Sequence, residues 1–245
     1  MFKNLKCLNL CAALLLSLSA KTTLAKDTAA DPYETYNRHA FRLNQKLDKV
    51  IFKPAATAYR AVLPIRIQQG ISNFFSNLDQ IPTIINDALQ GEGYYAISDT
   101  WRFVINSTIG VFGLIDVASR IELPRRQQDF GLTLAKWGYR SSAYLVIPIL
   151  GPRTVRDATA WPINYYFFSV YPYVNDDTTR YSLITLNVID TRAQLLDFDQ
   201  TIKQASFDPY VFQRNAYLQR RNYLINKNAQ HHSLHEEENA EDDEN

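Results

Sequence analysis

The sequence predicts a mainly α-helical protein with a single domain. Apolar residues recur at steps of three and four along most of the chain, which is the spacing of one face of an α-helix. One segment, from Gly131 to Gly151, interrupts this spacing with the apolar run Tyr144-Leu145-Val146-Ile147 between turn-forming residues. That run predicts a short hairpin or an extended loop rather than a helix.

The first 25 residues have the features of a signal peptide. Two lysines precede an apolar stretch that is too short to span a bilayer, and Thr23-Leu24-Ala25 is typical of a signal-peptidase site. A cut after Ala20 is the alternative. The chain's two cysteines, Cys7 and Cys11, both lie in this leader, so the expected mature chain has no disulfide and no thiol nucleophile.

Cys11 is a poor candidate for the acceptor cysteine of a lipoprotein. An acceptor should follow the apolar core and a small residue, whereas Cys11 precedes most of that core. We therefore expect export without an N-terminal lipid.

Charge divides the rest of the chain into a body and a tail. The chain has 26 basic and 25 acidic residues; three of the basic residues lie in the leader and seven of the acids lie in the last ten residues. The body, residues 26–230, therefore has 23 basic against 18 acidic residues, a mild excess that suits an anionic lipid surface but is far from a nucleic-acid signal. Residues 231–245 form an acidic tail that is too polar to bury a core, so we expect disorder there.

Several stretches of the body have helical spacing. In chain order they are an amphipathic helix with Tyr36, Ala40, Leu43, Leu47 and Val50 on one face; a stripe of Ile67, Ile71, Phe74, Phe75 and Leu78; the stretch from Ile81 to Leu89; a stripe of Tyr94, Ile97, Trp101, Val104 and Ile105; a helix to about Ile189; and a last helix from about Phe207 to Asn226. Pro54 either ends the first helix or starts the next. Asp176 or Asp177 can cap the helix that ends near Ile189.

The apolar faces of these helices allow two interpretations. In a soluble protein they pack against each other, which is the usual arrangement for any single amphipathic helix. Alternatively the helices lie in a membrane interface with their apolar faces in the lipid. Outside the leader the longest apolar run is about eight residues, far below the ~20 that a spanning helix needs.

No residue pattern points to catalysis, a metal site or a cofactor. His39 is the only histidine of the body, and it lacks a second ligand one helical turn away. The carboxylate pairs Asp176-Asp177 and Asp197-x-Asp199 are explained by turns or helix caps. The scattered glycines do not form a phosphate-binding loop. We therefore expect no enzyme activity.

Eight segments of the body form an ordered set of motifs. The segments are Asp31-Pro32-Tyr33-Glu34 with Asn37-Arg38, Phe41 and Asn44; Gly70 to Leu78; Pro82, Asn86 and Leu89-Gln90-Gly91; Arg102 to Ala118; Asp129-Phe130-Gly131 with Thr133-Leu134; Pro148 with Gly151-Pro152, Thr154 and Arg156-Asp157; Thr191-Arg192-Ala193 with Leu195-Leu196-Asp197; and Ser206 with Asp208-Pro209-Tyr210. Together they resemble the MlaA (VacJ) family of outer-membrane phospholipid-transport proteins.

The resemblance implies a ring of amphipathic helices held in the outer membrane of Gram-negative bacteria, on its periplasmic side. Such a ring encloses an amphipathic channel and associates with trimeric porins. It takes misplaced phospholipid from the outer leaflet and passes it to a soluble periplasmic carrier, which keeps the two leaflets asymmetric. Two other functions stay open: a structural partner of porins that moves no lipid, and a membrane-associated lipid hydrolase.

Two sets of residues are our candidates for the lipid passage. The ring helix has small polar residues and a phenylalanine pair, which place a polar face opposite an apolar one: Ser72, Asn73, Phe74, Phe75, Ser76 and Asn77. The segment from Gly131 to Gly151 resembles the family's flexible loop, and Gly131, Gly138 and Gly151 are its hinge candidates. It departs from the family at Arg140-Ser141-Ser142-Ala143, where family members often have more glycine, so we expect a stiffer loop.

Overall fold

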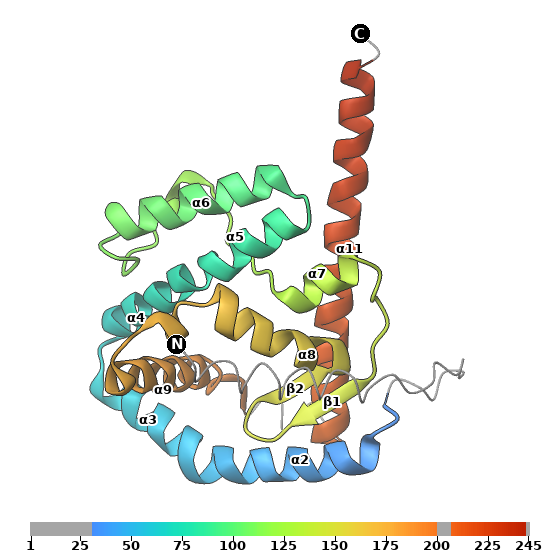
Figure 1. Cartoon of the computed structure of the whole chain (residues 1–245). Helices are drawn as coiled ribbons and strands as arrows, with labels where there is room; N and C mark the ends of the chain where they lie inside the picture. The colour runs from blue at the N-terminus through green and yellow to red at the C-terminus, as the bar shows by residue number, and fades with distance from the viewer. Residues whose placement is uncertain (1–30, 200–206, 244–245) are drawn as a thin grey trace.

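The first helical run is a bent rod that extends from residue 34 to residue 62. The structure, a computed structural model, describes residues 31–199 and 207–243, with side chains as far as Lys227 in the last helix (Figure 1). Helix α2 (Glu34–Leu47) continues through the π-helical turn η1 (Asp48–Phe52) into α3 (Lys53–Val62). Pro54 lies in the first turn of α3, directly after the π-helical turn η1. Of the two interpretations of Pro54, it therefore starts the next helix, although the backbone stays helical from α2 to α3.

Three helices follow, and each confirms a predicted helical stretch. They are α4 (Ile65–Leu78), α5 (Gln80–Leu89) and α6 (Gly93–Thr108). Helices α5 and α6 pack side by side (Figure 1), and the turn between them contains Gly91 with a φ of 75°. This left-handed conformation favours glycine because a Cβ would meet the backbone. A tight turn then leads to the 3-10 helix η2 (Ala118–Ile121).

The segment that interrupts the helical spacing is only partly a hairpin. Strands β1 (Tyr144–Ile147) and β2 (Gly151–Thr154) pair antiparallel, with Tyr144 opposite Thr154, which confirms the predicted hairpin. The first part of the segment is instead helix α7 (Phe130–Lys136), so the non-helical interpretation is wrong there. The side chain of Asp129 accepts a hydrogen bond from the Leu132 N–H at 2.9 Å, and this cap starts a helix despite the low helix propensity of Gly131.

The second half of the chain adds two long helices and several short ones. Helix α8 (Val155–Ile163) was not predicted; it is followed by the π-helical turn η3 (Asn164–Phe168) and the 3-10 turn η4 (Tyr171–Tyr173). Helix α9 (Asp177–Gln194) begins where the Asp176 carboxylate accepts the Thr179 N–H at 2.6 Å, which confirms Asp176 as a cap.

The last helix is longer than the sequence indicates. Helix α11 (Pro209–Asp243) continues past Asn226 through the segment where we expected disorder, and it projects beyond the other helices (Figure 1). Alanine and glutamate are strong helix formers, and both recur in this segment. The tail's dispensability remains a prediction.

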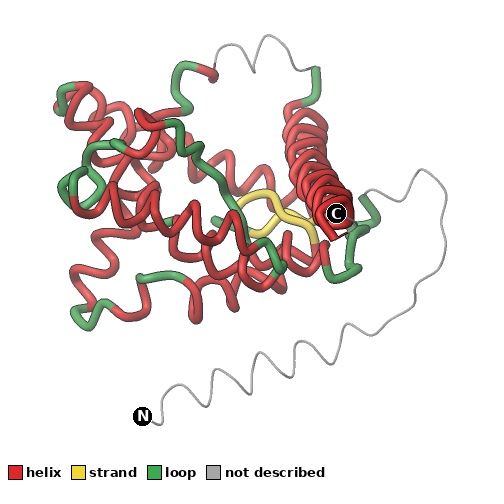
Figure 2. The backbone as a smooth tube through the Cα atoms, turned by 90° about the horizontal axis from the view of Figure 1, so that it is seen from above, coloured by secondary structure: helices red, strands yellow, loops and turns green. Residues whose placement is uncertain are grey.

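The helices close into a circuit. Helix α2 continues through η1 into α3, α3 packs on α9, α9 on α4, α4 on α5 and α5 on α7. From α7 the contacts pass through α11 and the hairpin back to α2. Figure 2, which looks down α11, shows the hairpin lying between that helix and the others. The arrangement is the ring of helices that the resemblance implied.

A small apolar core lies where α2, the hairpin and α11 meet. It comprises Ala40, Phe41, Tyr144, Val146 and Tyr210. Asn37 ties α2 to the hairpin, because its amide donates to the Tyr144 carbonyl at 3.1 Å and accepts from the Val146 N–H at 2.8 Å. Burial of these side chains explains the family-like segment at residues 31–44. Within residues 31–199 and 207–243, none of the helices is both long enough and apolar enough to cross a membrane.

Candidate functional site

The protein buries polar side chains and exposes large apolar ones. Among the described residues, 19 polar or charged residues are buried against 12 apolar ones. Helix α6 shows the inversion best: Asp99, Arg102 and Asn106 are buried, while the predicted stripe of Tyr94, Ile97, Trp101 and Val104 is exposed. The stripe of α6 therefore does not pack into the protein's own core, which was the usual interpretation for a single helix.

The first helix repeats the pattern of α6 in part. Of its predicted stripe, Tyr36, Leu43 and Val50 are all more than 45% exposed, whereas Ala40 is buried and Leu47 is half-buried. Its buried positions are Asn37, Ala40 and Phe41. Both helices thus present an apolar face outward and use the other face for polar or tightly packed contacts.

The candidate passage helix follows the inverted pattern only in part. In α4, Asn77 and Phe75 are the buried residues of the predicted set Ser72, Asn73, Phe74, Phe75, Ser76 and Asn77, whereas the other four are half-buried. The rings of Phe74 and Phe75 meet edge to face at 5.3 Å between centroids. The Asn73 amide donates to the Leu114 carbonyl at 3.1 Å, and the Ser72 hydroxyl accepts from Gln194 at 2.8 Å. The predicted polar face therefore contacts other parts of the protein.

That polar face borders a small enclosed cavity between α4 and α6. The cavity has a volume of about 30 Å³ and is lined by Asn73, Ser76, Asn77, Gln80, Arg102, Asn106, Asp116 and Arg125. The Asn77 amide donates to Ser107 at 2.8 Å, while its Oδ1 and the Gln80 Oε1 have no hydrogen-bond partner. A polar cavity of this size is large enough for water, which would satisfy such buried atoms.

Asp116 holds the turn after α6 against this cavity. It accepts hydrogen bonds from Arg102 at 2.6 Å and from Asn106 at 3.1 Å. Although burial works against ionisation, the hydrogen bonds from Ser119 and Arg102 lower the pKa of Asp116. The same turn contains Gly113, where a Cβ would lie 2.6 Å from that of Asn77. The glycine is therefore needed for the close approach of this turn to α4.

Two carboxylates are buried together between α5 and α6. Asp87 and Asp99 are both at most 1% exposed. Arg126 faces both, at 3.4 Å from Asp87 and 3.9 Å from Asp99, and stacks on the Tyr95 ring at 3.6 Å. Burial raises the pKa of each carboxyl group against the attraction of Arg126.

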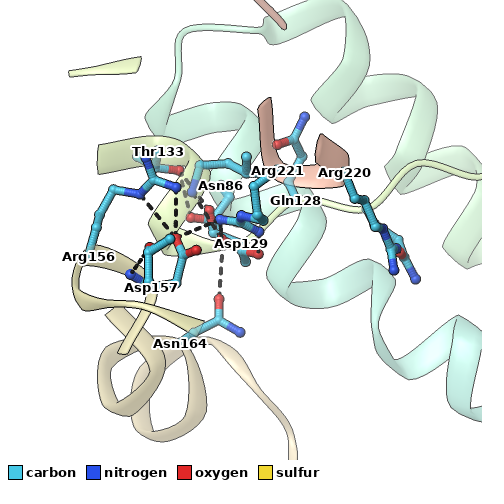
Figure 3. Close-up of polar contacts among 12 residues, drawn as sticks. Asn86, Gln128, Asp129, Thr133, Arg156, Asp157, Asn164, Arg220 and Arg221 are labelled. Atoms are coloured by element: carbon cyan, nitrogen blue, oxygen red, sulfur yellow. Dashed lines mark hydrogen bonds and ion pairs between the residues drawn. The ribbon is translucent and has the colours of Figure 1, made fainter. Parts of the chain in front are cut away.

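A second buried charge network joins α7, α8 and α11 (Figure 3). The Arg221 guanidinium bonds to Asp129 at 2.6 Å and to Asp157 at 2.8 Å, and Arg156 also bonds to Asp157, at 3.0 Å. Although burial favours the neutral acid, Arg221 lowers the pKa of Asp129. Tyr217 donates to Asp157 at 2.7 Å. Each of these carboxylates forms an ion pair with an arginine. The network therefore holds helices of the ring together and does not have the arrangement of a catalytic pair.

An open, basic groove lies beside this network. It has a volume of about 330 Å³ and is lined by Arg125, Arg126, Gln127, Gln128, Leu224 and Lys227. The loop before α7 forms one wall and α11 forms the other. Arg125 lines both this groove and the enclosed cavity beside α4. These groove residues were not among the residues predicted from the sequence. The only local signal was the adjacent pair Arg125 and Arg126, shortly before the helix cap Asp129.

The three hinge candidates have different settings. Gly138 and Gly151 have φ values of 114° and 82°, and nothing lies within 4 Å of a Cβ built on either. Gly138 lies before the hairpin, whereas Gly151 is the first residue of β2 and is paired with Ile147. Gly131 instead lies inside α7, where a Cβ would come within 3.0 Å of Asp157. Its role in the structure is close packing.

The carboxylate pairs of the sequence analysis have structural roles. Asp176 caps α9, and Asp177 pairs with Arg180 at the exposed end of that helix. Asp199 bonds to Lys53 at 2.5 Å and to Arg192 at 3.0 Å, which ties α3 to α9. In the described part of the chain, no three histidine, cysteine or carboxylate side chains come close enough to hold a metal ion.

Comparison with known proteins finds a matching family model and similar sequences. A model of the family described as MlaA lipoprotein matches residues 29–224. The chain is 36% identical to a protein of Rickettsia felis over 186 residues, which are 76% of this chain and 74% of that protein. It is also 36% identical to the Escherichia coli intermembrane phospholipid transport system lipoprotein MlaA over 204 residues, 80% of this chain and 79% of that protein.

A solved structure has the same arrangement. It is described as the structural basis for maintenance of bacterial outer membrane lipid asymmetry, and it superimposes with a TM-score of 0.68 at 34% identity. The match covers 80% of this chain and 98% of that chain. The similarity therefore includes nearly all of that structure.

Proposed function

This chain belongs to the MlaA lipoprotein family, and we propose that it is the outer-membrane component of intermembrane phospholipid transport. In this function it removes mislocalised phospholipid from the outer leaflet and passes it to a carrier, which maintains lipid asymmetry. The transfer breaks no covalent bond, so the protein needs no catalytic residue or cofactor.

The main support for the proposal is that large apolar side chains are exposed while polar side chains are buried. Helices α2 and α6 expose apolar residues, which acyl chains would cover, and α6 buries Asp99, Arg102 and Asn106 against α5 and the turn that follows α6. A phospholipid headgroup is costly to place in hydrocarbon without hydrogen bonds. A ring that is apolar outside and polar inside supports passage of a headgroup while it lies in one leaflet.

The position and partners follow from this function. The protein is exported through a cleaved signal peptide and lies at the periplasmic side of the outer membrane. There it associates with a trimeric porin, which offers an apolar surface to the exposed stripes, and delivers lipid to a soluble periplasmic carrier. The buried charge networks hold the ring closed while its loop regions move.

Comparison of gene deletion with wild type tests the function. Loss of the gene should raise the phospholipid exposed on the cell surface and increase sensitivity to detergent. Unchanged outer-leaflet composition after the deletion would contradict the proposal and favour a structural partner of porins that moves no lipid. Lipid hydrolysis by the purified protein would favour the hydrolase.

Deletion of Asn73 and Phe74 tests the candidate passage helix. Removing two residues rotates the rest of α4 by about 200°, which breaks the contacts of Asn77 with Ser107 and of Asn73 with Leu114. We expect lipid to leak or stall while the fold largely survives. Phe74→Leu keeps the helical register and is the matched control. A folded deletion variant that transports like wild type would remove α4 from the mechanism.

Two cysteines that tie the segment from Gly131 to Gly151 shut test the hinge. Gly138 and Gly151 provide the backbone freedom that this movement needs. Transfer should stop in the oxidised protein and return on reduction. Transfer that is unaffected by the lock would show that this loop does not gate the passage.

A further inference from the structure

The basic groove beside α11 has more positive charge than its surroundings neutralise. Arg125, Arg126 and Lys227 line it, and Arg220 lies at its rim, where it donates to Gln127 at 2.7 Å. Figure 3 shows Arg220 pointing away from the buried network of Arg221, so it belongs to the groove side of the helix. Three cations therefore line one open space of about 330 Å³, and Arg220 bonds to the lining residue Gln127.

The carboxylates near the groove are already engaged or distant. Arg126 already faces Asp87 at 3.4 Å and Asp99 at 3.9 Å, so part of its charge is engaged there. Among the described side chains, none places a carboxylate within 4.0 Å of Arg125 or Lys227. The Arg125 side chain is exposed and lines the open groove. A cation without a close carboxylate partner is a favourable place for an anion.

The groove also has the shape and polarity of an amphipathic ligand site. Leu224 contributes an apolar side chain to a wall that is otherwise polar. Arginine side chains hold phosphate oxygens through two parallel hydrogen bonds, and lysine adds a point charge. The space is far larger than inorganic phosphate alone requires, which leaves room for the glycerol and the first part of an acyl chain.

We propose that this groove is a binding site for a phosphate ester, and that its ligand is the headgroup phosphate of a phospholipid. The inference rests on the proposed transport function for the source of the ligand. Arg125 lines both the groove and the polar cavity beside α4, so the site lies next to the candidate passage. A headgroup that leaves the passage would be held here against α11 by Arg125, Arg126 and Lys227.

Calorimetric titration of the full-length protein in a non-ionic detergent tests the site. The probes are dihexanoyl phosphatidylglycerol, its chain-free headgroup glycerophosphoglycerol, and inorganic phosphate. We expect the lipid to bind most tightly, and both other probes to compete with it. Binding should weaken with added salt, because an open site is screened by ions.

The double substitution Arg125→Gln and Lys227→Gln should weaken lipid binding by about tenfold or more, since each removes a charge-assisted contact. The matched control is Arg66→Gln with Lys46→Gln, two exposed cations on α4 and α2. The control should bind within about twofold of wild type, because its charges are far from any ligand contact. Arg125→Lys with Lys227→Arg keeps the charge and should restore most of the affinity, and circular dichroism checks the fold of every variant.

Three results would overturn the inference. They are no binding of any probe to the wild-type protein, an equal loss in the Arg66 and Lys46 control, and tighter binding of inorganic phosphate than of the lipid. The last result would make free phosphate the ligand. None of them bears on the proposed transport function, which fails only if deletion of the gene leaves the outer leaflet unchanged.

Discussion

Replacement of Gly131 with alanine should destabilise the protein through a single methyl group. Gly131 is buried in α7 against the network that joins α7, α8 and α11. A Cβ there would come well inside 3.0 Å of Asp157 Oδ1, and would lie 2.9 Å from Arg221 Nη2 and 3.0 Å from Asp129 Oδ1. These atoms belong to buried or capping groups, so they cannot move away without breaking their own bonds.

Three contributions set the size of the effect. Overpacking a tight site costs about 1–3 kcal/mol, and separation of a buried ion pair costs about 3–5 kcal/mol when it is complete. Alanine recovers about 1 kcal/mol through its higher helix propensity. With the Arg221–Asp157 pair strained rather than fully broken, we expect a loss of about 3 kcal/mol. For a chain of this size that lowers the unfolding midpoint by about 6–12 °C.

Thermal unfolding in detergent, followed by circular dichroism, measures this loss. Gly93→Ala is the matched control, because nothing lies within 4 Å of a Cβ at Gly93 and its φ is ordinary. The control should unfold within about 2 °C of wild type, since a change at an open site is worth under 0.5 kcal/mol. A Gly131→Ala protein as stable as the control would refute the packing argument and return Gly131 to the hinge candidates.

Three further predictions concern pH and the two ends of the chain. Burial raises the pKa of Asp79 from 3.8 to about 6, so as pH falls the folded state takes up this proton before the unfolded state does. Stability should therefore rise by up to about 3 kcal/mol between pH 7 and pH 4 from this group, and Asp79→Asn should remove that part of the slope in urea titrations. Truncation after Gln230 should leave outer-membrane function intact in the detergent-sensitivity assay, and a null phenotype would contradict this. Mass spectrometry of protein purified from membranes should find an N-terminus near Lys26 without lipid; a diacylglyceryl-cysteine would show the opposite.

The sequence predicted those helices whose spacing is regular. The stripes of α2, α4 and α6 appear where they were expected, and Asp176 caps α9 as its position indicated. Local signals failed where tertiary contacts outweigh propensity. Helix α7 contains Gly131 and is only seven residues long, so its periodicity is weak, and what stabilises it is the Asp129 cap and the contact with Arg221.

The direction in which each stripe faces could not be predicted from a single helix. An apolar stripe looks the same whether it packs on a protein core or lies against lipid. In α6 the direction of the stripe depends on two buried residues. Arg102 pairs with Asp116, which lies after the following turn, and Asp99 lies against Asp87 of α5. Only when the chain folds do these polar groups meet inside, and the stripe is then left outside.

The sequence by itself determined the helical class, the expected export and the family resemblance, because these depend on residue type and spacing along the chain. The tertiary structure alone decided which polar side chains share an interior and which cations share a groove. Arg125 and Lys227 are 102 positions apart and line one groove only because the loop before α7 packs beside α11. A site assembled across such a distance leaves no local pattern, since its geometry depends on how the ring closes.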